Sequence, residues 1–322
     1  MTALHPGDLL DHYKIDSLVA RSGMASIYKA TDVRDHRTVA IKVPHPEMES
    51  DPVLFDRFKR EQEIGQKLDH PGVMKVFKDD HHSRIYMVME WVDGHLLRDE
   101  MGGGKKLPRE RAVRIAARIA DALDYIHANG VVHRDLKPEN IMIDAEDRIK
   151  LIDFGIAGHE GSRRLTFAKL SNVMGTPDYI SPEQVKGKRG DGRSDIYALG
   201  VMLYEMLTGK VPFSGANPFL TMNERLLNNP VPPREIDPTI SPELQEIVYR
   251  AIEREPANRY AHAREFLKDL EHPEQVGVAE RAELQNWRVH KSHWPRRILN
   301  YALLALVPIV IFTLLLLVAR RG

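Results

Sequence analysis

The chain has 322 residues, which is enough for one large domain or two ordinary ones. Its 46 Lys and Arg residues balance its 46 Asp and Glu residues, so nothing in the charge suggests a nucleic-acid partner. The absence of cysteine excludes disulfides, thiolate zinc sites and cysteine nucleophiles. No basic and apolar leader opens the sequence, and we expect no signal peptide.

The first part of the chain is rich in predicted strands. Their composition and spacing place them at 13–19, 26–30, 38–43 and 85–94. The third of these strands carries Lys42, and a lysine inside a β-branched strand is costly unless it has a charged partner. A helix is predicted over 55–68, directly after this strand.

A helix beginning at Pro108 leads to the most polar stretch of the sequence. The apolar positions of this helix follow a helical period at Ala112, Ile115, Ile119, Leu123 and Ile126. It ends at Asn129-Gly130. The residues that follow are His133-Arg134-Asp135-Leu136-Lys137-Pro138-Glu139-Asn140, and Asp153-Phe154-Gly155 comes soon afterwards.

The spacing within this polar stretch suggests a chemical site. Asp135 and Lys137 alternate on an extended loop, so both can face one reacting group. Two short strands at 141–143 and 148–152 form a predicted hairpin that would carry Asp153 back beside Asn140. A base, a cation and two metal ligands are the parts that in-line phosphoryl transfer needs.

The second half of the chain is predicted to be helical after a polar segment. Residues after Gly155 are rich in Ser, Thr, Arg and Lys as far as Gly175–Glu183, and such a segment is a poor core former. The stretch Asp195–Thr208 is almost entirely apolar, which indicates a buried helix. Further helices are predicted near 242–253 and 261–270.

These motifs resemble the eukaryotic-type protein kinases, and the bacterial membrane-anchored serine/threonine kinases best. The resemblance covers residues 11–270. It implies an α+β, two-lobed protein kinase fold, with a small β-rich lobe over about 11–92 and a large helical lobe over about 93–270. Lys137, two residues after the catalytic aspartate, is the serine/threonine form.

The resemblance also assigns roles to the polar residues. ATP and Mg²⁺ are the implied cofactors, with Mn²⁺ as the other candidate metal. Asp135 would accept the proton of a substrate hydroxyl and Lys137 would balance phosphoryl charge, while Asn140 and Asp153 would hold the metal. Lys42 would contact the α- and β-phosphates, and the resemblance assigns Glu61 of the helix at 55–68 as its partner, with Glu63 as the alternative on another face.

The nucleotide-binding elements implied by the resemblance lie in two loops. Where the family has Gly-x-Gly-Gly-Met-Gly, this chain has only one of the glycines, and its phosphate loop comprises Ala20, Ser22, Gly23 and Ala25. We therefore expect a weakened affinity for ATP. The hinge would bond adenine through the Glu90 carbonyl and the Val92 backbone, with Met89 behind the base.

Several residues of the large lobe are assigned by the same resemblance. Arg134 would bind a phosphate on the activation segment, whose candidate acceptors are Thr166 and Ser171. Three further residues are expected to have structural roles: Thr176 beside the catalytic loop, Asp195 as acceptor of catalytic-loop amides, and Arg259 as the buried partner of Glu183.

Two other functions stay open at this point. A catalytically weak or silent kinase-like membrane scaffold would fit the loss of glycines. Against it, the six polar residues that the resemblance assigns to nucleotide binding and catalysis are intact, namely Lys42, Glu61, Asp135, Lys137, Asn140 and Asp153. A small-molecule phosphotransferase on the same fold fits less well, because Gly175–Glu183 resembles the segment that docks a peptide. The expected partners are therefore proteins bearing Ser or Thr, and a homodimer, lipids or another protein stay open as the source of an activating signal.

The C-terminal region carries the pattern of a membrane anchor. Residues 298–319 contain no charge and would span ~33 Å as a helix, about the thickness of a bilayer core. The preceding linker, 271–297, has four basic residues and no acidic one between 284 and 297. This bias favours a cytoplasmic kinase domain. We expect a single-pass, tail-anchored protein of the cell (inner) membrane.

Overall fold

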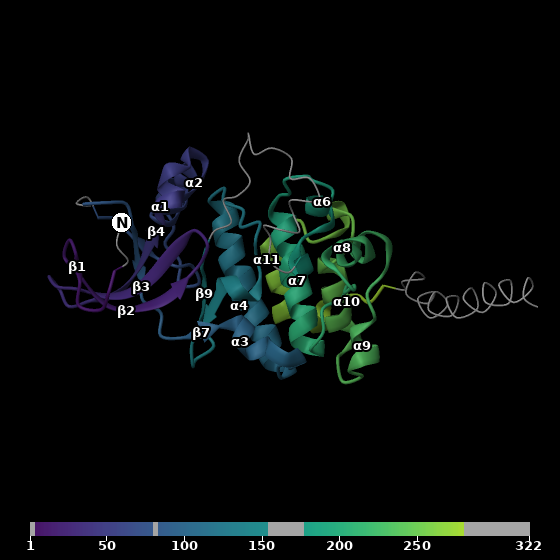
Figure 1. Cartoon of the computed structure of the whole chain (residues 1–322). Helices are drawn as coiled ribbons and strands as arrows, with labels where there is room; N and C mark the ends of the chain where they lie inside the picture. The colour runs from purple at the N-terminus through teal and green to yellow at the C-terminus, as the bar shows by residue number, and fades with distance from the viewer. Residues whose placement is uncertain (1–3, 80–82, 154–176, 280–322) are drawn as a thin grey trace, which may run out of the picture. The chain divides into compact units, whose positions relative to one another are not determined.

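The computed structural model describes residues 4–79, 83–153 and 177–279. These residues form a β-rich small lobe and a larger helical lobe, as predicted (Figure 1). The six strands of the small lobe are β1 (Leu9–Leu10), β2 (Tyr13–Arg21), β3 (Ala25–Asp32), β4 (Thr38–Pro44), β5 (Val76–Phe77) and β6 (Met87–Glu90). They pair antiparallel in the order β1-β2-β3-β4-β6-β5.

The two faces of this sheet bury different sets of side chains. In β4, Val39 and Ile41 face one hydrophobic cluster, whereas Ala40 faces a second cluster that includes Phe58 of helix α2. Side chains alternate across a strand, so Lys42 shares the face of Ala40. The strand therefore directs Lys42 toward α2.

Two helices follow β4, α1 (Pro46–Ser50) and α2 (Pro52–Gly65). The second begins and ends three residues before the predicted bounds of 55–68. Asp51 sets its start, because its carboxylate accepts hydrogen bonds from the amides of Val53 and Leu54 at 2.9 and 3.3 Å. The pair Asp51-Pro52 is itself a start signal, because proline is favoured at the first position of a helix.

The large lobe contains eight α-helices among the described residues. They are α3 (Leu97–Met101), α4 (Arg109–Ala128), α6 (Pro182–Val185), α7 (Gly192–Thr208), α8 (Pro218–Leu227), α9 (Pro233–Ile236), α10 (Pro242–Ala251) and α11 (Ala263–Glu271). The helices α3, α6, α8 and α9 were not predicted, because most are too short to show a period. A small sheet, β7 (His95–Leu96), β8 (Ile141–Ile143) and β9 (Ile149–Leu151), adjoins the small lobe.

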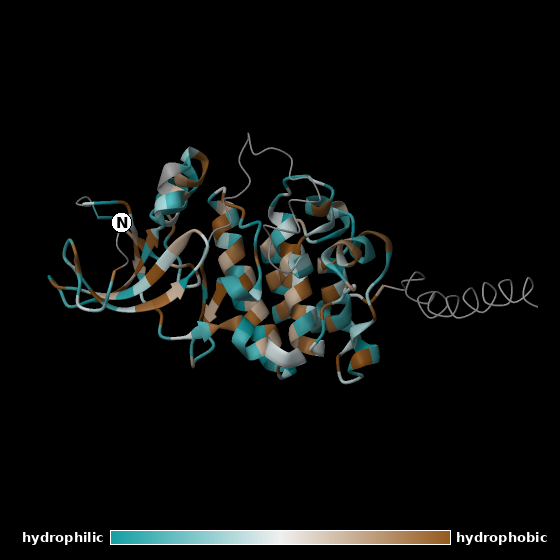
Figure 2. Ribbon diagram, viewed as in Figure 1, coloured by the Kyte–Doolittle hydropathy of each residue, from teal (hydrophilic) through white to brown (hydrophobic). Residues whose placement is uncertain are grey.

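The helix α7 is the centre of the large lobe. It packs against α4, α10 and α11, and its residues from Ser194 to Thr208 are buried. The colouring by hydropathy shows hydrophobic residues along α4 and α7 where these helices lie side by side (Figure 2). The prediction of a buried helix at 195–208 is confirmed, although the helix starts at Gly192, after the Asp191 cap.

No helix within the described parts of the chain is long and apolar enough to cross a bilayer. The predicted span at 298–319 lies outside those parts.

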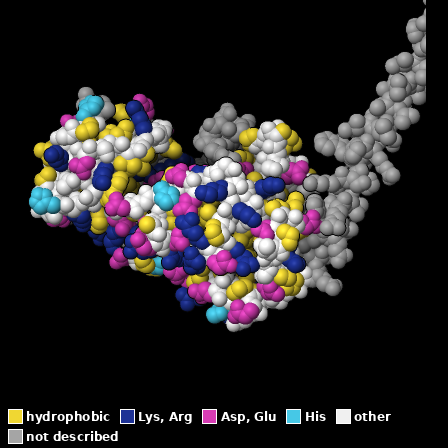
Figure 3. Space-filling model, turned by 90° about the horizontal axis from the view of Figure 1, so that it is seen from below, with side chains coloured by type: hydrophobic (Ala, Val, Ile, Leu, Met, Phe, Trp, Pro, Cys, Tyr) yellow, Lys and Arg dark blue, Asp and Glu magenta, His cyan; other side chains and the backbone are white. Residues whose placement is uncertain are grey.

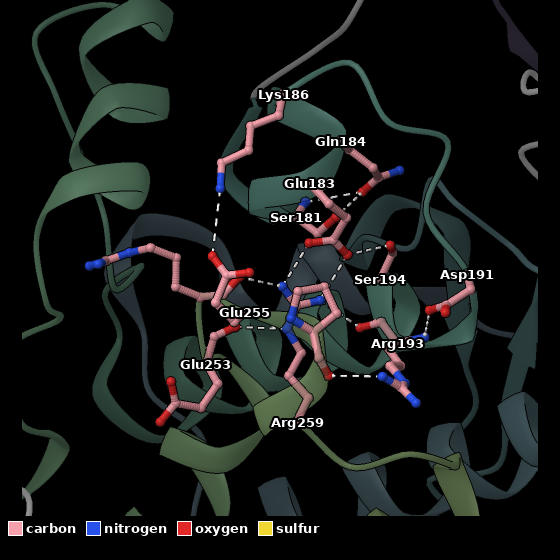
Figure 4. A network of polar contacts seen from close by, with 12 residues as sticks. Ser181, Glu183, Gln184, Lys186, Asp191, Arg193, Ser194, Glu253, Glu255 and Arg259 are labelled. Carbon is pink, nitrogen blue, oxygen red and sulfur yellow. Dashed lines mark hydrogen bonds and ion pairs between the residues drawn. The ribbon is translucent and has the colours of Figure 1, made fainter.

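A buried ion pair joins α6 to the segment that precedes α11 (Figure 4). Both carboxylate oxygens of Glu183 accept hydrogen bonds from Arg259, at 2.8 and 2.7 Å, and the Ser194 hydroxyl donates to the same carboxylate at 2.6 Å. The Arg259 side chain is fully buried. Burial by itself would raise the pKa of Glu183, but the bonds from Arg259 lower that pKa to about 2. The predicted pairing of these two residues is confirmed.

This pair predicts an acid-dependent loss of stability. The folded-state pKa of Glu183 lies below its ordinary value of 4.5, so its contribution is present above pH 4.5 and is lost as the pH falls toward 2. The contribution is about 3 kcal/mol, in proportion to the lowered pKa. We expect Glu183→Gln to destabilise the protein at pH 7, and the difference from wild type to shrink below pH 4.5.

Chemical unfolding of both proteins between pH 3 and 7 measures this difference. The matched control is Glu255→Gln, since Glu255 is exposed and lies 3.7 Å from Lys186. A constant difference between wild type and Glu183→Gln across this pH range would contradict the assignment.

Candidate active site

The site is built around Lys42. Its Nζ donates to Glu61 Oε1 of α2 and to Asp153 Oδ1, just after β9, both at 2.7 Å. The sheet face described above brings Lys42 to α2, and the β8–β9 hairpin returns the chain to the same point. The alternative partner, Glu63, is exposed on another side of α2. One cation therefore joins two carboxylates from distant parts of the sequence.

The charges of this trio support one another. Burial by itself would lower the pKa of Lys42, but the carboxylates of Asp153 and Glu61 raise it overall. Burial would raise the pKa of Asp153, but the attraction of Lys42 lowers it. Burial does raise the pKa of Glu61, because Lys42 only partly offsets it. Lys42 is thus a cation and Asp153 a carboxylate at neutral pH.

The loop from His133 to Asn140 presents its side chains alternately. Asp135, Lys137 and Glu139 are exposed or half-buried, whereas the residues between them and Asn140 are buried. Lys137 Nζ donates to Asp135 Oδ2 at 2.8 Å. Asn140 Nδ2 donates to the Asp135 carbonyl at 2.8 Å. The loop therefore places a carboxylate and an ammonium group on one face, as the spacing predicted.

Asp195, in the first turn of α7, stabilises this loop through hydrogen bonds. Its carboxylate accepts the backbone amides of His133 and Arg134 at 2.8 and 2.7 Å, and it lies 2.8 Å from His127 Nε2. Arg134 has a φ of +64°, a conformation that costs energy in a residue with a side chain. The predicted role of Asp195 is confirmed, and these bonds stabilise the strained backbone.

The hairpin brings Asn140 and Asp153 to neighbouring positions. The amide of Ile152, beside Asp153, donates to the Asn140 carbonyl at 2.9 Å, and Ile141 pairs with Leu151 in the β8–β9 register. The two side chains offer an amide oxygen and a carboxylate. Mg²⁺ commonly takes one or two carboxylates together with water and phosphate oxygens, so these donors fit it. No group of three His, Cys, Asp or Glu side chains within the described ranges could hold a metal.

The loop between β2 and β3 is closed by a side chain. Ser22 Oγ accepts the backbone amides of Ala25 and Met24 at 3.1 and 3.3 Å, and it donates to the Ala25 carbonyl at 3.1 Å. None of the residues from Ala20 to Ala25 has a positive φ. The missing glycines therefore cause no backbone strain here, and the hydroxyl of Ser22 occupies amides that a phosphate would use.

The hinge contains a contact that sequence reasoning missed. The side chain of Glu90 accepts the amide of Lys75 at 2.8 Å and the ammonium group of Lys150 at 2.6 Å. Lys150 belongs to β9, so this ion pair joins the two sheets. Of the other predicted hinge residues, Met89 is buried and Val92 is half-buried. The sequence shows Lys150 as a single lysine in a predicted strand, as it shows Lys42. This pattern indicates that a charged partner is needed, but it does not indicate that the partner is Glu90.

The predicted residues Thr166, Ser171 and Thr176 lie outside the described parts of the chain. The other predicted site residues fall into three groups around Lys42. The phosphate loop carries Ala20, Ser22, Gly23 and Ala25; the hinge carries Glu90 and Val92; the remaining group comprises Glu61, Asp135, Lys137, Asn140 and Asp153.

Sequence comparison agrees with this arrangement. Residues 13–270 match the protein kinase domain family. The chain belongs to this family. It is 39% identical over 271 residues to the probable serine/threonine-protein kinase SCO3848 of Streptomyces coelicolor. It is 38% identical over 270 residues to the serine/threonine-protein kinase PknB of Mycobacterium leprae.

The matches cover most of this chain but less than half of each relative. They cover 83% and 82% of this chain but only 40% and 43% of the two relatives. The chain thus spans about two fifths of the length of these curated relatives. A similar solved structure is the kinase domain of Mycobacterium tuberculosis PknI, with 27% identity and a TM-score of 0.65. That comparison covers 84% of this chain and all of the PknI chain.

The closed β2–β3 loop leads to a prediction about nucleotide affinity. We expect Ser22→Ala to bind ATP roughly two- to tenfold more tightly than wild type, since a hydrogen bond to the competing hydroxyl contributes about 0.5–1.5 kcal/mol. Calorimetric titration with ATP and Mg²⁺ measures the dissociation constants. The triple variant Ala20→Gly, Ser22→Gly and Ala25→Gly should gain about as much as Ser22→Ala.

The control Ser26→Ala removes a neighbouring hydroxyl that lies 2.9 Å from His45 Nε2, outside the loop. Equal ATP affinity of wild type, Ser22→Ala and the triple variant would show that the missing glycines have no effect.

Proposed function

We propose that this chain is a serine/threonine protein kinase that transfers the γ-phosphate of ATP to Ser or Thr side chains of proteins. The observation that carries the proposal is the position of Lys42, which bonds Glu61 and Asp153 at the same time. A charged lysine held in this way is arranged to bind the phosphates of a nucleotide. The catalytic loop, fixed by Asp195, presents Asp135 and Lys137 on one face.

The chemistry follows from the residues that the structure describes. Asp135 accepts the proton of the substrate hydroxyl as its oxygen forms a bond to the γ-phosphorus, and the bond from that phosphorus to the β,γ-bridging oxygen breaks to release ADP. Lys137, bonded to Asp135, balances the negative charge of the transferring group. Mg²⁺ held by Asn140 and Asp153 would neutralise further phosphate charge.

The decisive experiment compares the full chain with its Asp135→Asn variant. With radiolabelled ATP and Mg²⁺, we expect wild type to incorporate phosphate into Ser or Thr of a general protein substrate and into itself. Asp135→Asn should lose about 100-fold or more of this rate, because a general base contributes about 10²–10⁴-fold. Unchanged ATP binding and an unchanged unfolding midpoint in the variant would show that its fold is retained.

Mapping of the incorporated phosphate tests autophosphorylation. We propose that Thr166 or Ser171 is the acceptor and that Arg134 binds the phosphate, which a guanidinium group does well. A wild-type chain that binds ATP but transfers no phosphate would instead support a silent, kinase-like scaffold.

We further propose that residues 298–319 anchor the chain in the cell membrane, with the kinase domain in the cytoplasm. The support is the uncharged run itself and the basic residues before it. The double variant Val310→Arg, Ile311→Arg places two charges near its centre. Each costs about 2.5–3.5 kcal/mol on insertion scales.

We expect this double variant to leave the carbonate-resistant membrane fraction, in which the wild-type chain should be found. Val278→Arg, at an exposed position outside the run, is the control and should behave as wild type. Membrane retention of the double variant would contradict the anchor.

A further inference from the structure

Arg98 of α3 is the centre of a second polar cluster, beside the catalytic loop. Its Nε donates to Glu139 Oε1 at 2.8 Å, and its Nη1 donates to Glu205 Oε1 at 2.9 Å. Its Nη2 donates to the hydroxyl of Tyr179, which in turn donates to Glu205 Oε2. All three guanidinium nitrogens of Arg98 therefore donate hydrogen bonds to residues of this chain.

The position of Glu139 relates this cluster to the reaction. Glu139 lies in the single 3-10 turn Pro138–Asn140, directly after Lys137, and is partly exposed, as Lys137 is. Glu139 comes four positions after Asp135, which limits the distance between their Cα atoms to about 14 Å. The side chain of Glu139 is 40% exposed. A residue near the phosphorylated Ser or Thr of a bound protein would reach it.

The cluster holds more negative than positive charge. Glu139, Glu205 and nearby Asp178 face Arg98, while Arg225 uses its guanidinium on the carbonyls of Pro177 and Asp178. Oε2 of Glu139 is buried without a hydrogen-bond partner among the described residues. Burial raises the pKa of Asp178, and the charges of Glu205 and Glu139 add to this rise.

Without an internal cation, such a group of carboxylates would attract a basic side chain from a substrate. Arginine would be the strongest competitor, because its fork bonds carboxylates in a bidentate way. Arg98 already supplies that fork, and it loses no translational freedom on binding, unlike a substrate residue. Its charge also repels an incoming cation, which is a direct way to exclude a class of partner.

We propose that Arg98 is a specificity-determining residue, which fills the acidic site of Glu139 and Glu205 and so prevents selection of substrates with Arg or Lys near the acceptor. This inference rests on the proposed kinase function. The preferred substrates are proteins whose Ser or Thr has neutral or acidic neighbours on the side of the acceptor that faces Glu139.

One face of the described residues carries charged side chains of both signs. On the face shown in Figure 3, Lys and Arg side chains are interspersed with Asp and Glu side chains over the described residues. Mixed charge of this kind produces little net attraction for a basic or an acidic protein. The charge of this face therefore offers no selection between basic and acidic substrates.

A purely structural role for Arg98 makes a different prediction. Arg98 joins α3, the catalytic loop and α7, so its loss would lower stability and the overall rate. A structural clamp would lower the rate for every substrate alike. Only a specificity role changes the preference between substrates, and the preference is therefore the quantity to measure.

The experiment uses the full chain with a positional-scanning library of Ser/Thr peptides, labelled ATP and Mg²⁺. For wild type we expect less than about twofold preference for Arg over Ala at any position. For Arg98→Gln we expect a preference of roughly tenfold for Arg at one or two positions, the effect of one new hydrogen bond between charged groups. Adding Glu139→Gln to Arg98→Gln should remove most of this gain.

Two controls separate charge from fold. Arg98→Lys keeps the positive charge and should retain the wild-type preference, even if its rate falls. Arg111 has a matched environment, since it is similarly exposed and donates to Glu100 and Asp147 at 2.8 and 2.7 Å in another part of the lobe. Arg111→Gln should also keep the wild-type preference.

The possible results are distinguishable. A wild-type preference for Arg or Lys overturns the inference without any variant, and so does an unchanged preference profile in an active Arg98→Gln. If Arg98→Gln is inactive, the wild-type and Arg98→Lys profiles still decide, because a basic preference in either overturns the proposal. If wild type labels neither itself nor any peptide, the proposed kinase function fails together with this inference.

Discussion

The site depends on the buried carboxylate of Asp195. This side chain extends from the central helix of the large lobe and binds two successive amides of the catalytic loop. A buried carboxylate is costly unless it is hydrogen-bonded. The loop amides therefore stabilise the carboxylate of α7, and this carboxylate in turn fixes the loop. Because α7 is packed on several sides, the loop inherits a rigid support. Asp135 and Lys137 can then keep a fixed geometry on a loop that has no regular secondary structure.

The two lobes are joined by charges of opposite sign. Lys42 of the small lobe bonds Asp153, which follows the hairpin of the large lobe, and Lys150 of that hairpin bonds Glu90 in the hinge. The first pair lies at the proposed phosphate site, and the second lies in the proposed hinge. A nucleotide bound between these pairs would contact both lobes at once. The relative position of the lobes is therefore coupled to the groups proposed to bind the phosphates.

Arginine has three separate roles in the large lobe. Arg259 neutralises a buried glutamate and acts as a scaffold. Arg98 neutralises carboxylates at the edge of the reaction site, where the same type of bond bears on substrate choice. Arg134 has its backbone fixed by Asp195, and its Nε has no partner among the described residues. Arginine side chains thus serve stability at one place in the lobe and, as proposed, substrate selection and regulation at two others. Their burial and their hydrogen-bond partners decide which role each one has.

The resemblance of the sequence motifs to the protein kinases indicated the fold class, and the sequence pattern by itself determined the polar stretch at 133–140 and the buried helix at 195–208, because spacing and composition are local properties. It also identified Lys42 and Asp153, since a lysine in a β-branched strand and a carboxylate after a hairpin need specific surroundings. Only the tertiary structure decided which side chains meet across the fold. Lys150 with Glu90, Arg98 with Glu139 and Glu205, and the hydroxyl of Ser22 over its own loop depend on the packing of distant elements, or on one rotamer. No local pattern encodes the contacts of Lys150 and Arg98.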